Sequence, residues 1–127
     1  MTGGHRDVIA WRKAMSLVTA VYSATENFPQ REVYGLTQQL RRAAVSVPSN
    51  IAEGKARLSM KEFVQFLSKA RGSLAELATQ LEIAKNLGYL METTYNSLAE
   101  QAAECGRVLN GLIDGVQRQI NIPATSD

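Results

Sequence analysis

Apolar residues recur every three or four positions along most of the chain, which is the spacing of one face of an α-helix. Two runs keep this spacing without interruption. They consist of Phe63, Leu67, Ala70, Leu74, Leu77, Leu81 and Ala84, and of Tyr95, Leu98, Ala102, Cys105, Leu109, Leu112 and Val116. Alternating steps of four and three form a heptad seam, by which helices pack side by side. No segment alternates apolar and polar residues as a β-strand would, so the sequence predicts an all-α protein.

Capping residues and helix breakers indicate where the helices begin and end. Asp7 is a candidate N-cap, Ser59 and Glu62 have the spacing of a capping box, and Gly88 is a C-terminal stop. The helices are expected at about residues 8–28, 36–57, 60–87 and 94–119 of a single domain of 127 residues with short flexible ends. Because short connections favour antiparallel neighbours, the predicted architecture is an up-down-up-down four-helix bundle.

The second helix contains an unusual stretch, "RRAAVSVPSNIAEGKAR" at residues 41–57, with Pro48 at its centre. A proline inside a helix removes one backbone hydrogen bond and costs about 3 kcal/mol. At about 100° per residue, the helix divides into three bands. The first is large and aliphatic, the second is built of small apolar side chains around Pro48, and the third is polar. The polar band consists of Arg42, Ser46, Asn50, Glu53 and Arg57.

A bundle helix needs only one apolar band to face its own core. We therefore expect the small-residue band to face another copy of the chain, with Pro48 on the outer side. The candidate interface residues are Ala44, Val45, Pro48, Ser49, Ala52 and Ala56. The alternative is a bundle deep enough to cover both apolar bands within one chain. The polar band is expected to form ion pairs and to satisfy backbone groups near the proline.

Charge is distributed unevenly, although the net charge is only +2. Residues 1–57 carry +4, residues 58–91 carry +1 and residues 92–127 carry −3. This asymmetry indicates either a basic surface for an anionic partner or helices of opposite sign lying side by side. The second interpretation is favoured.

The sequence offers little catalytic chemistry. His5 is the single histidine and falls in a leader before the first helix, and Cys105 lies on a seam, where a thiol packs as a small buried hydrophobe. Gly111 and Gly115 share a helix face and indicate either a close neighbour or two tolerated surface glycines. With no metal-ligand or phosphate-loop pattern, we expect no enzymatic activity, metal, cofactor or small-molecule substrate.

The chain also lacks the features of membrane and secreted proteins. Its apolar runs are too short to span a bilayer, and its first residues do not form a secretory leader. A single cysteine fits a reducing compartment. These observations predict a cytoplasmic protein that does not associate with membranes.

Four segments, "AWRKAMSLV", "YGLTQQLRRAAVSVPSNIAEG", "KEFVQFLSKARGSLAELATQLEIAKNLGYL" and "GRVLNGLI", carry a family resemblance. The chain resembles, from about Arg6 to Gln119, the small bundle proteins encoded in intervening sequences of bacterial 23S ribosomal RNA genes. It is also similar to the accessory protein of diversity-generating retroelements. The resemblance implies a left-handed up-down bundle, a ring-shaped homopentamer, no established enzymatic activity and RNA as an anionic partner.

Two functions from different classes follow. The first is a homo-oligomeric bundle that binds RNA or a nucleic-acid-bound protein. Its candidate phosphate contacts, expected to cluster around the end of the second helix, are Arg41, Arg42, Lys55, Arg57 and Lys61. The second is a protein-binding scaffold or accessory subunit of a nucleoprotein complex, in which the outer helix faces engage a protein.

Overall fold

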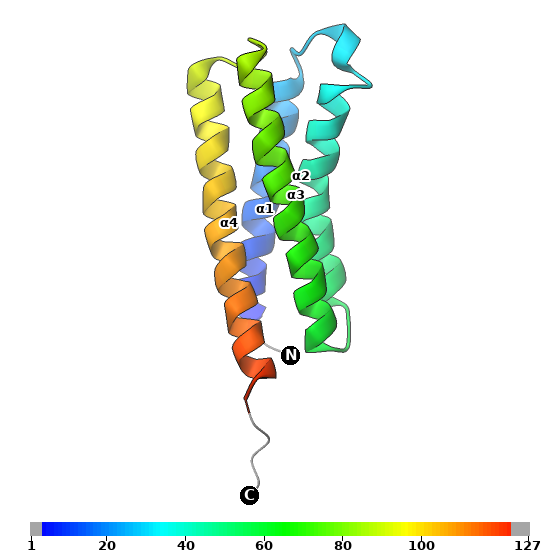
Figure 1. Ribbon diagram of the computed structural model, residues 1–127, viewed down its shortest axis with the longest axis vertical. Helices are drawn as coiled ribbons and strands as arrows, with labels where there is room; N and C mark the ends of the chain where they lie inside the picture. Colours follow the sequence, from blue (N-terminus) through cyan, green and yellow to red (C-terminus); the bar gives the residue numbers. More distant parts are fainter. Residues whose placement is uncertain (1–3, 123–127) are drawn as a thin grey trace, which may run out of the picture.

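Four long helices make up almost all of the described chain. The computed structural model describes residues 4–122, with side chains from Arg6 onward (Figure 1). The helices are α1 (Gly4–Thr25), α2 (Leu36–Lys55), α3 (Met60–Asn86) and α4 (Glu92–Ile120), and a short 3₁₀ turn, η1 (Gln30–Glu32), precedes α2. Residues 4–122 contain no strand, which confirms the all-α prediction.

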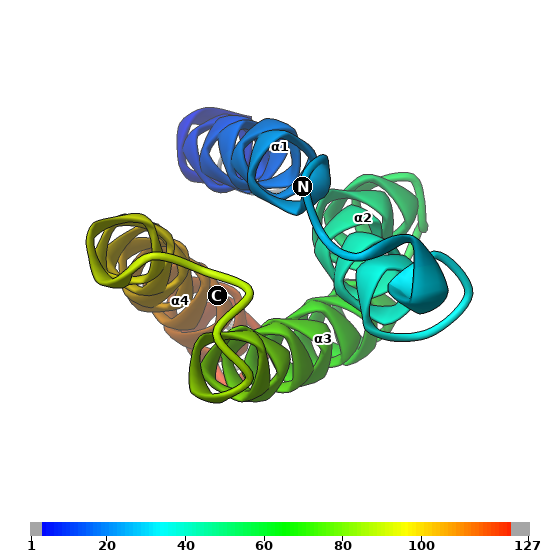
Figure 2. The same ribbon diagram turned by 90° about the horizontal axis from the view of Figure 1, so that it is seen from above.

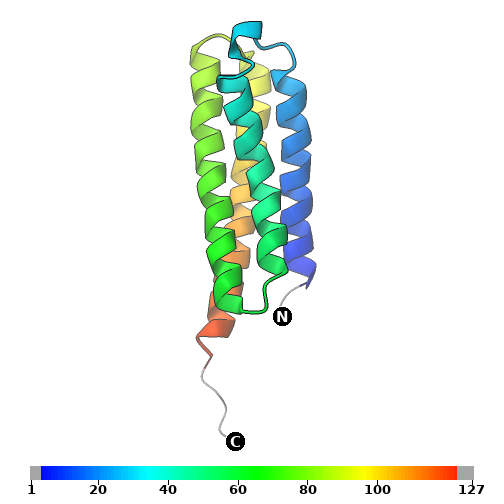
Figure 3. The same ribbon diagram turned by 90° about the vertical axis from the view of Figure 1, so that its right-hand side faces the viewer.

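The helices lie side by side around a common core. Each helix contacts its neighbour along the chain, α1 also contacts α4, and α2 and α4 lie on a diagonal of the bundle (Figure 2). The α1–α2 and α3–α4 connections lie at one end, and the α2–α3 connection lies at the other (Figure 3). None of the helices in residues 4–122 is long and apolar enough to cross a membrane.

The two heptad seams form the centre of the core. All seven seam residues of α3 are buried, and in α4 only Tyr95 remains partly exposed. The first band of α2 is buried as well, from Leu36 to Ile51. The periodic positions predicted from the sequence are therefore the positions that pack.

The ends of α3 follow the predicted capping chemistry. The Ser59 hydroxyl accepts hydrogen bonds from the backbone amides of Lys61 and Glu62 at 3.1 and 3.3 Å. Gly88 adopts a φ of 79°, and the amide of Tyr89 donates to the carbonyl of Ala84 at 2.9 Å. This arrangement closes the helix with a Schellman-type turn.

The first helix differs from its predicted bounds. It begins at Gly4 rather than near residue 8, so Asp7 lies in its first turn instead of capping it. His5 likewise falls inside α1 rather than in a leader, and its side chain lies outside the described part. The helix ends at Thr25, whose hydroxyl donates to the carbonyl of Val21 at 2.8 Å.

The apolar face of α1 is wider than the core can cover. Its buried residues are Ala10, Ala14, Leu17 and Val21. Trp11, Met15 and Tyr22 also follow one another at helical spacing, but they are 40–42% exposed.

A contact network ties the two connections at one end of the bundle. The Glu32 carboxylate accepts from the backbone amide of Leu36 at 2.9 Å, which caps α2, and from the Tyr89 hydroxyl at 3.0 Å. The Tyr89 ring also packs against Phe28, with ring centroids 5.4 Å apart. The hydrogen bonds from Leu36 and then Tyr89 lower the pKa of Glu32 from its ordinary value of 4.5.

Candidate functional site

The five predicted phosphate contacts fall into two separate groups. Arg41 and Arg42 lie in the first half of α2, whereas Lys55, Arg57 and Lys61 surround the α2–α3 connection. Lys55 follows Arg42 by 13 positions in the same helix, a separation of about 20 Å along its axis. The expectation that all five cluster around the end of the second helix is therefore wrong, because Arg41 and Arg42 lie more than three turns away.

Three of the five cations are engaged within the chain. Arg41 crosses from α2 to α1, where Nε donates to Thr25 Oγ1 at 2.9 Å and the guanidinium stacks 4.5 Å from the centroid of the Tyr22 ring. Lys55 Nζ contacts Asp7 Oδ2 at 2.5 Å and compensates a carboxylate that is only 4% exposed. The third, Arg57, pairs with Glu53 at 2.9 Å and lies over the Phe66 ring.

Arg42 and Lys61 differ from these three. Both are exposed, and within the described part of the chain neither side chain has an ion pair or hydrogen bond to another residue. They are therefore the two predicted contacts whose charged groups have no partner within the described residues.

Opposite charges do meet between neighbouring helices. Lys13 of α1 lies 3.5 Å from Glu104 of α4, and Arg107 pairs with Glu100 and Glu104 within α4. The hydrogen bond from Arg107, followed by the charge of Lys13, lowers the pKa of Glu104. The interpretation that helices of opposite charge lie side by side therefore holds for α1 and α4. The basic helix α2 does not contact the acidic helix α4.

The small-residue band of α2 is divided between the core and the surface. Ala44 and Pro48 are buried within the single chain, while Val45, Ser49, Ala52 and Ala56 are exposed. The expectation that Pro48 lies on the outer side is wrong, because the bundle is deep enough to cover two of the six residues of this band. An interface formed by the four exposed residues stays a prediction.

The polar band of α2 lies along α3. Ser46 and Ser73 join the two helices through a hydrogen bond of 2.7 Å between their hydroxyls. Asn50 Nδ2 donates to the carbonyl and the hydroxyl of Ser46 at 2.8 and 2.9 Å. Pro48 has no N–H, so the carbonyl of Ala44, four residues earlier, lacks its helical hydrogen bond. The Asn50 side chain donates to the carbonyl of Ser46 beside Pro48 and does not reach that of Ala44. Of the work predicted for this band, the ion pair between Glu53 and Arg57 is present, whereas no side chain among the described residues reaches the carbonyl that Pro48 leaves free and Arg42 takes no part.

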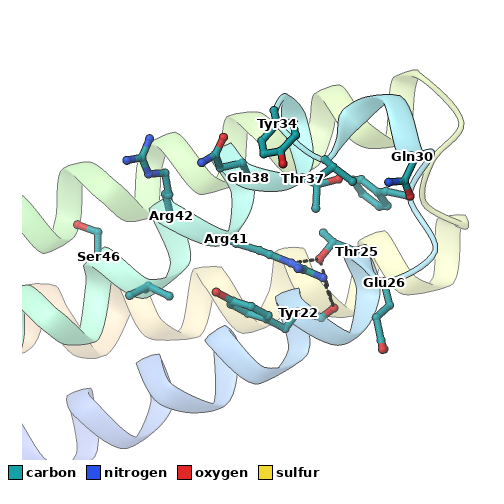
Figure 4. Close-up of a pocket in the computed structure, with 13 residues that line it drawn as sticks. Tyr22, Thr25, Glu26, Gln30, Tyr34, Thr37, Gln38, Arg41, Arg42 and Ser46 are labelled. Atoms are coloured by element: carbon teal, nitrogen blue, oxygen red, sulfur yellow. Dashed lines mark hydrogen bonds between the residues drawn. The ribbon is translucent and has the colours of Figure 1, made fainter.

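An open cleft of about 670 Å³ lies between the C-terminal end of α1, the connection around η1 and the first half of α2. Figure 4 shows the Arg41 side chain reaching across it to Tyr22 and Thr25. The Thr37 side chain is buried in its wall, and the hydroxyl has no hydrogen-bond partner. Tyr34 lies at its edge with 89% of its surface exposed.

Sequence reasoning did not group these cleft residues. Tyr22 falls within the predicted first helix at residues 8–28, and Tyr34 falls in the connection before the predicted second helix. Arg41 was included, but as a surface phosphate contact. Only the antiparallel packing of α1 against α2 brings Tyr22 next to Arg41, which follows it by 19 residues. The local sequence pointed to this cleft only through Tyr34, an aromatic residue next to Gly35 in a polar connection.

The remaining chemical candidates are structural. Cys105 is 1% exposed, and burial raises the pKa of its thiol to about 11. A Cβ on Gly115 would meet the Arg6 guanidinium, whereas one on Gly111 would meet nothing within 4 Å. From Arg6 to Ile122 no three His, Cys, Asp or Glu side chains gather as metal ligands.

Comparisons with known proteins give one family and one similar fold. Residues 6–111 match the family model of the 23S rRNA-intervening sequence protein. A crystal structure of a protein of unknown function from the S23 ribosomal protein family of Bacteroides thetaiotaomicron has a similar fold, with a TM-score of 0.78. The two sequences are 20% identical, and the match covers 86% of this chain and 98% of the other. No curated protein matches the chain.

Proposed function

Because the chain belongs to the 23S rRNA-intervening sequence protein family, we propose that it is a non-enzymatic protein that assembles from several copies and binds RNA in the cytoplasm. Each copy would keep the left-handed up-down bundle that the family resemblance implies, and five copies would form a ring. Neither the family nor the similar structure is assigned a reaction.

Self-association is supported by an apolar stripe on α1. We define this α1 stripe as the side chains of Val8, Trp11 and Met15, which are 40–46% exposed. The three residues lie within about 60° of one another around the helix. The small exposed residues of α2, Ser49, Ala52 and Ala56, would permit close approach of a second copy. A continuous apolar stripe of this kind is typical of an interaction surface.

RNA binding is supported by the charges of the helices. Three cations against one carboxylate give α2 a net charge of +2, whereas two cations against four carboxylates give α4 a net charge of −2. Arg42 and Lys61 provide exposed charges for phosphate contacts. One copy offers only a weak basic surface, but repetition in an assembly can raise the apparent affinity by about 10²-fold or more.

Light scattering coupled to size-exclusion chromatography tests the assembly. We expect the purified chain to elute as a multiple of 13.9 kDa. Trp11→Glu places a charge in the stripe and should yield monomers. Leu58→Glu alters a fully exposed residue outside the stripe and should leave the assembly intact. A wild-type chain that is monomeric at micromolar concentration would refute the proposal of self-association.

Titration with labelled RNA at several salt concentrations tests the second part. Phosphate contacts release counterions, so the affinity should fall steeply between low and moderate salt. The monomeric Trp11→Glu variant should bind at least tenfold more weakly than the assembly, provided circular dichroism shows that it remains helical. Absence of binding at low salt would refute the proposal of RNA binding.

A further inference from the structure

The cleft between α1 and α2 has two rows of side chains with different properties. Thr37, Arg41 and Val45 follow one another at intervals of four residues and form an inner row facing α1. Tyr34, Gln38 and Arg42 have the same spacing and form the rim (Figure 4). The rim thus presents an aromatic ring, an amide and a cation in order.

The inner row is held in place before any ligand arrives. Arg41 donates to Thr25 Oγ1 at 2.9 Å and to the Tyr22 carbonyl at 3.4 Å, while the Tyr22 ring supports its guanidinium. A guanidinium has five N–H donors, so these two bonds leave others for an anion in the cleft. A fixed set of donors binds a ligand with a smaller loss of side-chain entropy.

The rim carries the chemistry that proteins use to bind single-stranded RNA. Such proteins stack unpaired bases on aromatic rings, contact base edges with polar side chains and contact phosphates with cations. Tyr34 lies in the turn that precedes α2, and Gln38 and Arg42 lie in the first two turns of α2, so the ring, the amide and the cation follow one another along the rim (Figure 4). An isolated phosphate or carboxylate would use only the arginines and would leave the exposed ring of Tyr34 without a role.

We infer that this cleft binds an unstacked nucleotide of single-stranded RNA, with its base on Tyr34 and an adjoining phosphate at Arg42 and Arg41. The inference rests on the RNA binding proposed above and assigns that binding to the α1–α2 cleft. Lys61, in the first turn of α3 and thus beyond the C-terminal end of α2, would contact phosphates elsewhere along the RNA strand.

Fluorescence anisotropy with a labelled octauridylate tests this assignment in the 127-residue chain. Tyr34→Ala should weaken binding about tenfold, because loss of one base stack costs roughly 5- to 100-fold in affinity. Arg42→Gln should also weaken binding about tenfold, because it removes the charge that contacts the phosphate. Leu58→Ala removes an exposed apolar side chain at the other end of the bundle, and Arg118→Gln removes an exposed charge from α4. These matched controls should change the affinity less than threefold. Circular dichroism should show the same helix content for all four variants.

The outcomes separate this inference from the proposed function. If octauridylate binds but Tyr34→Ala matches Leu58→Ala and Arg42→Gln matches Arg118→Gln, RNA binding stands and the cleft assignment fails. An RNA duplex of the same length that binds equally well would overturn the requirement for an unstacked base. If an octaglutamate peptide competes as well as unlabelled octauridylate, the cleft recognises negative charge alone and the inference is wrong. A wild-type chain that binds no RNA would refute both the proposed RNA binding and its assignment to the cleft.

Discussion

A Cβ atom placed on Gly54 would lie 2.7 Å from the Cβ of Phe66, a distance too short for two side-chain carbons. It would also lie 3.0 Å from a ring carbon of Phe63. Gly54 is buried, so the missing side chain is what allows α2 and α3 to approach each other near their connection. The glycine that ends the "VPSNIAEG" stretch therefore serves packing within one chain.

Replacement of Gly54 by alanine should destabilise the protein. Overpacking of this kind costs about 1–3 kcal/mol, and it outweighs the higher helix propensity of alanine. Gly72→Ala is the matched control, because a Cβ at this exposed position in α3 would meet nothing within 4 Å. We expect that control to be stabilised by up to about 1 kcal/mol. Urea unfolding followed by circular dichroism measures both, and equal stabilities for the two variants would contradict the packing argument.

The acid stability of the bundle should depend on Glu32. The folded state lowers the pKa of this carboxyl below its ordinary value of 4.5, through the amide of Leu36 and the hydroxyl of Tyr89. Its contribution is therefore present above about pH 4.5 and is lost as the pH falls through the lower, folded-state pKa. Glu32→Gln should melt at a lower temperature than the wild type at pH 7, and the difference should shrink toward pH 3.

Tyr89→Phe serves as the companion variant. It removes one of the two hydrogen bonds to Glu32 but keeps the ring that packs on Phe28. Its melting temperature at pH 7 should lie between those of the wild type and Glu32→Gln. A difference between wild type and Glu32→Gln that stays constant from pH 7 to pH 3 would show that the charge of Glu32 is not responsible.

The single thiol should be unreactive in the folded protein. Cys105 is almost completely buried, and its pKa of about 11 keeps it neutral at pH 8. Because the thiolate is the reactive species, Ellman's reagent should modify the native chain at least 100-fold more slowly than the chain in guanidinium chloride. The rate of modification of the native chain should also not rise around pH 9, where an ordinary thiol ionises. Rapid native modification at pH 8 would show that this part of the core opens readily.

Sequence periodicity predicted the secondary structure well because burial repeats with the helix. Every apolar position of the α3 seam is buried, and the capping of α3 by Ser59 follows a local hydrogen-bonding pattern. The bounds of α1 were less accurate. Asp7 has the character of an N-cap, but its carboxylate pairs with Lys55, a residue 48 positions away. Local reasoning has no access to such a partner.

The candidate site was harder to predict than the fold. Helical projection placed Ala44, Val45 and Pro48 in one band of α2. In the structure Ala44 and Pro48 are buried and Val45 is exposed. This division depends on how all four helices pack, which the sequence of one helix does not contain. The predicted basic cluster failed for a similar reason. Arg41, Lys55 and Arg57 each find a partner within the fold, whereas Arg42 and Lys61 have none among the described residues.

The diagonal placement of α2 and α4 gives the bundle an electric dipole across its width. The acidic helix lies on one side, and the basic helix with Arg42 lies on the opposite side. In the field of a polyanion, such a molecule experiences a torque that turns α2 toward the anion before contact. The orientation of first encounter would then be set by the long-range field, and the cleft residues would act only once α2 already faces its ligand.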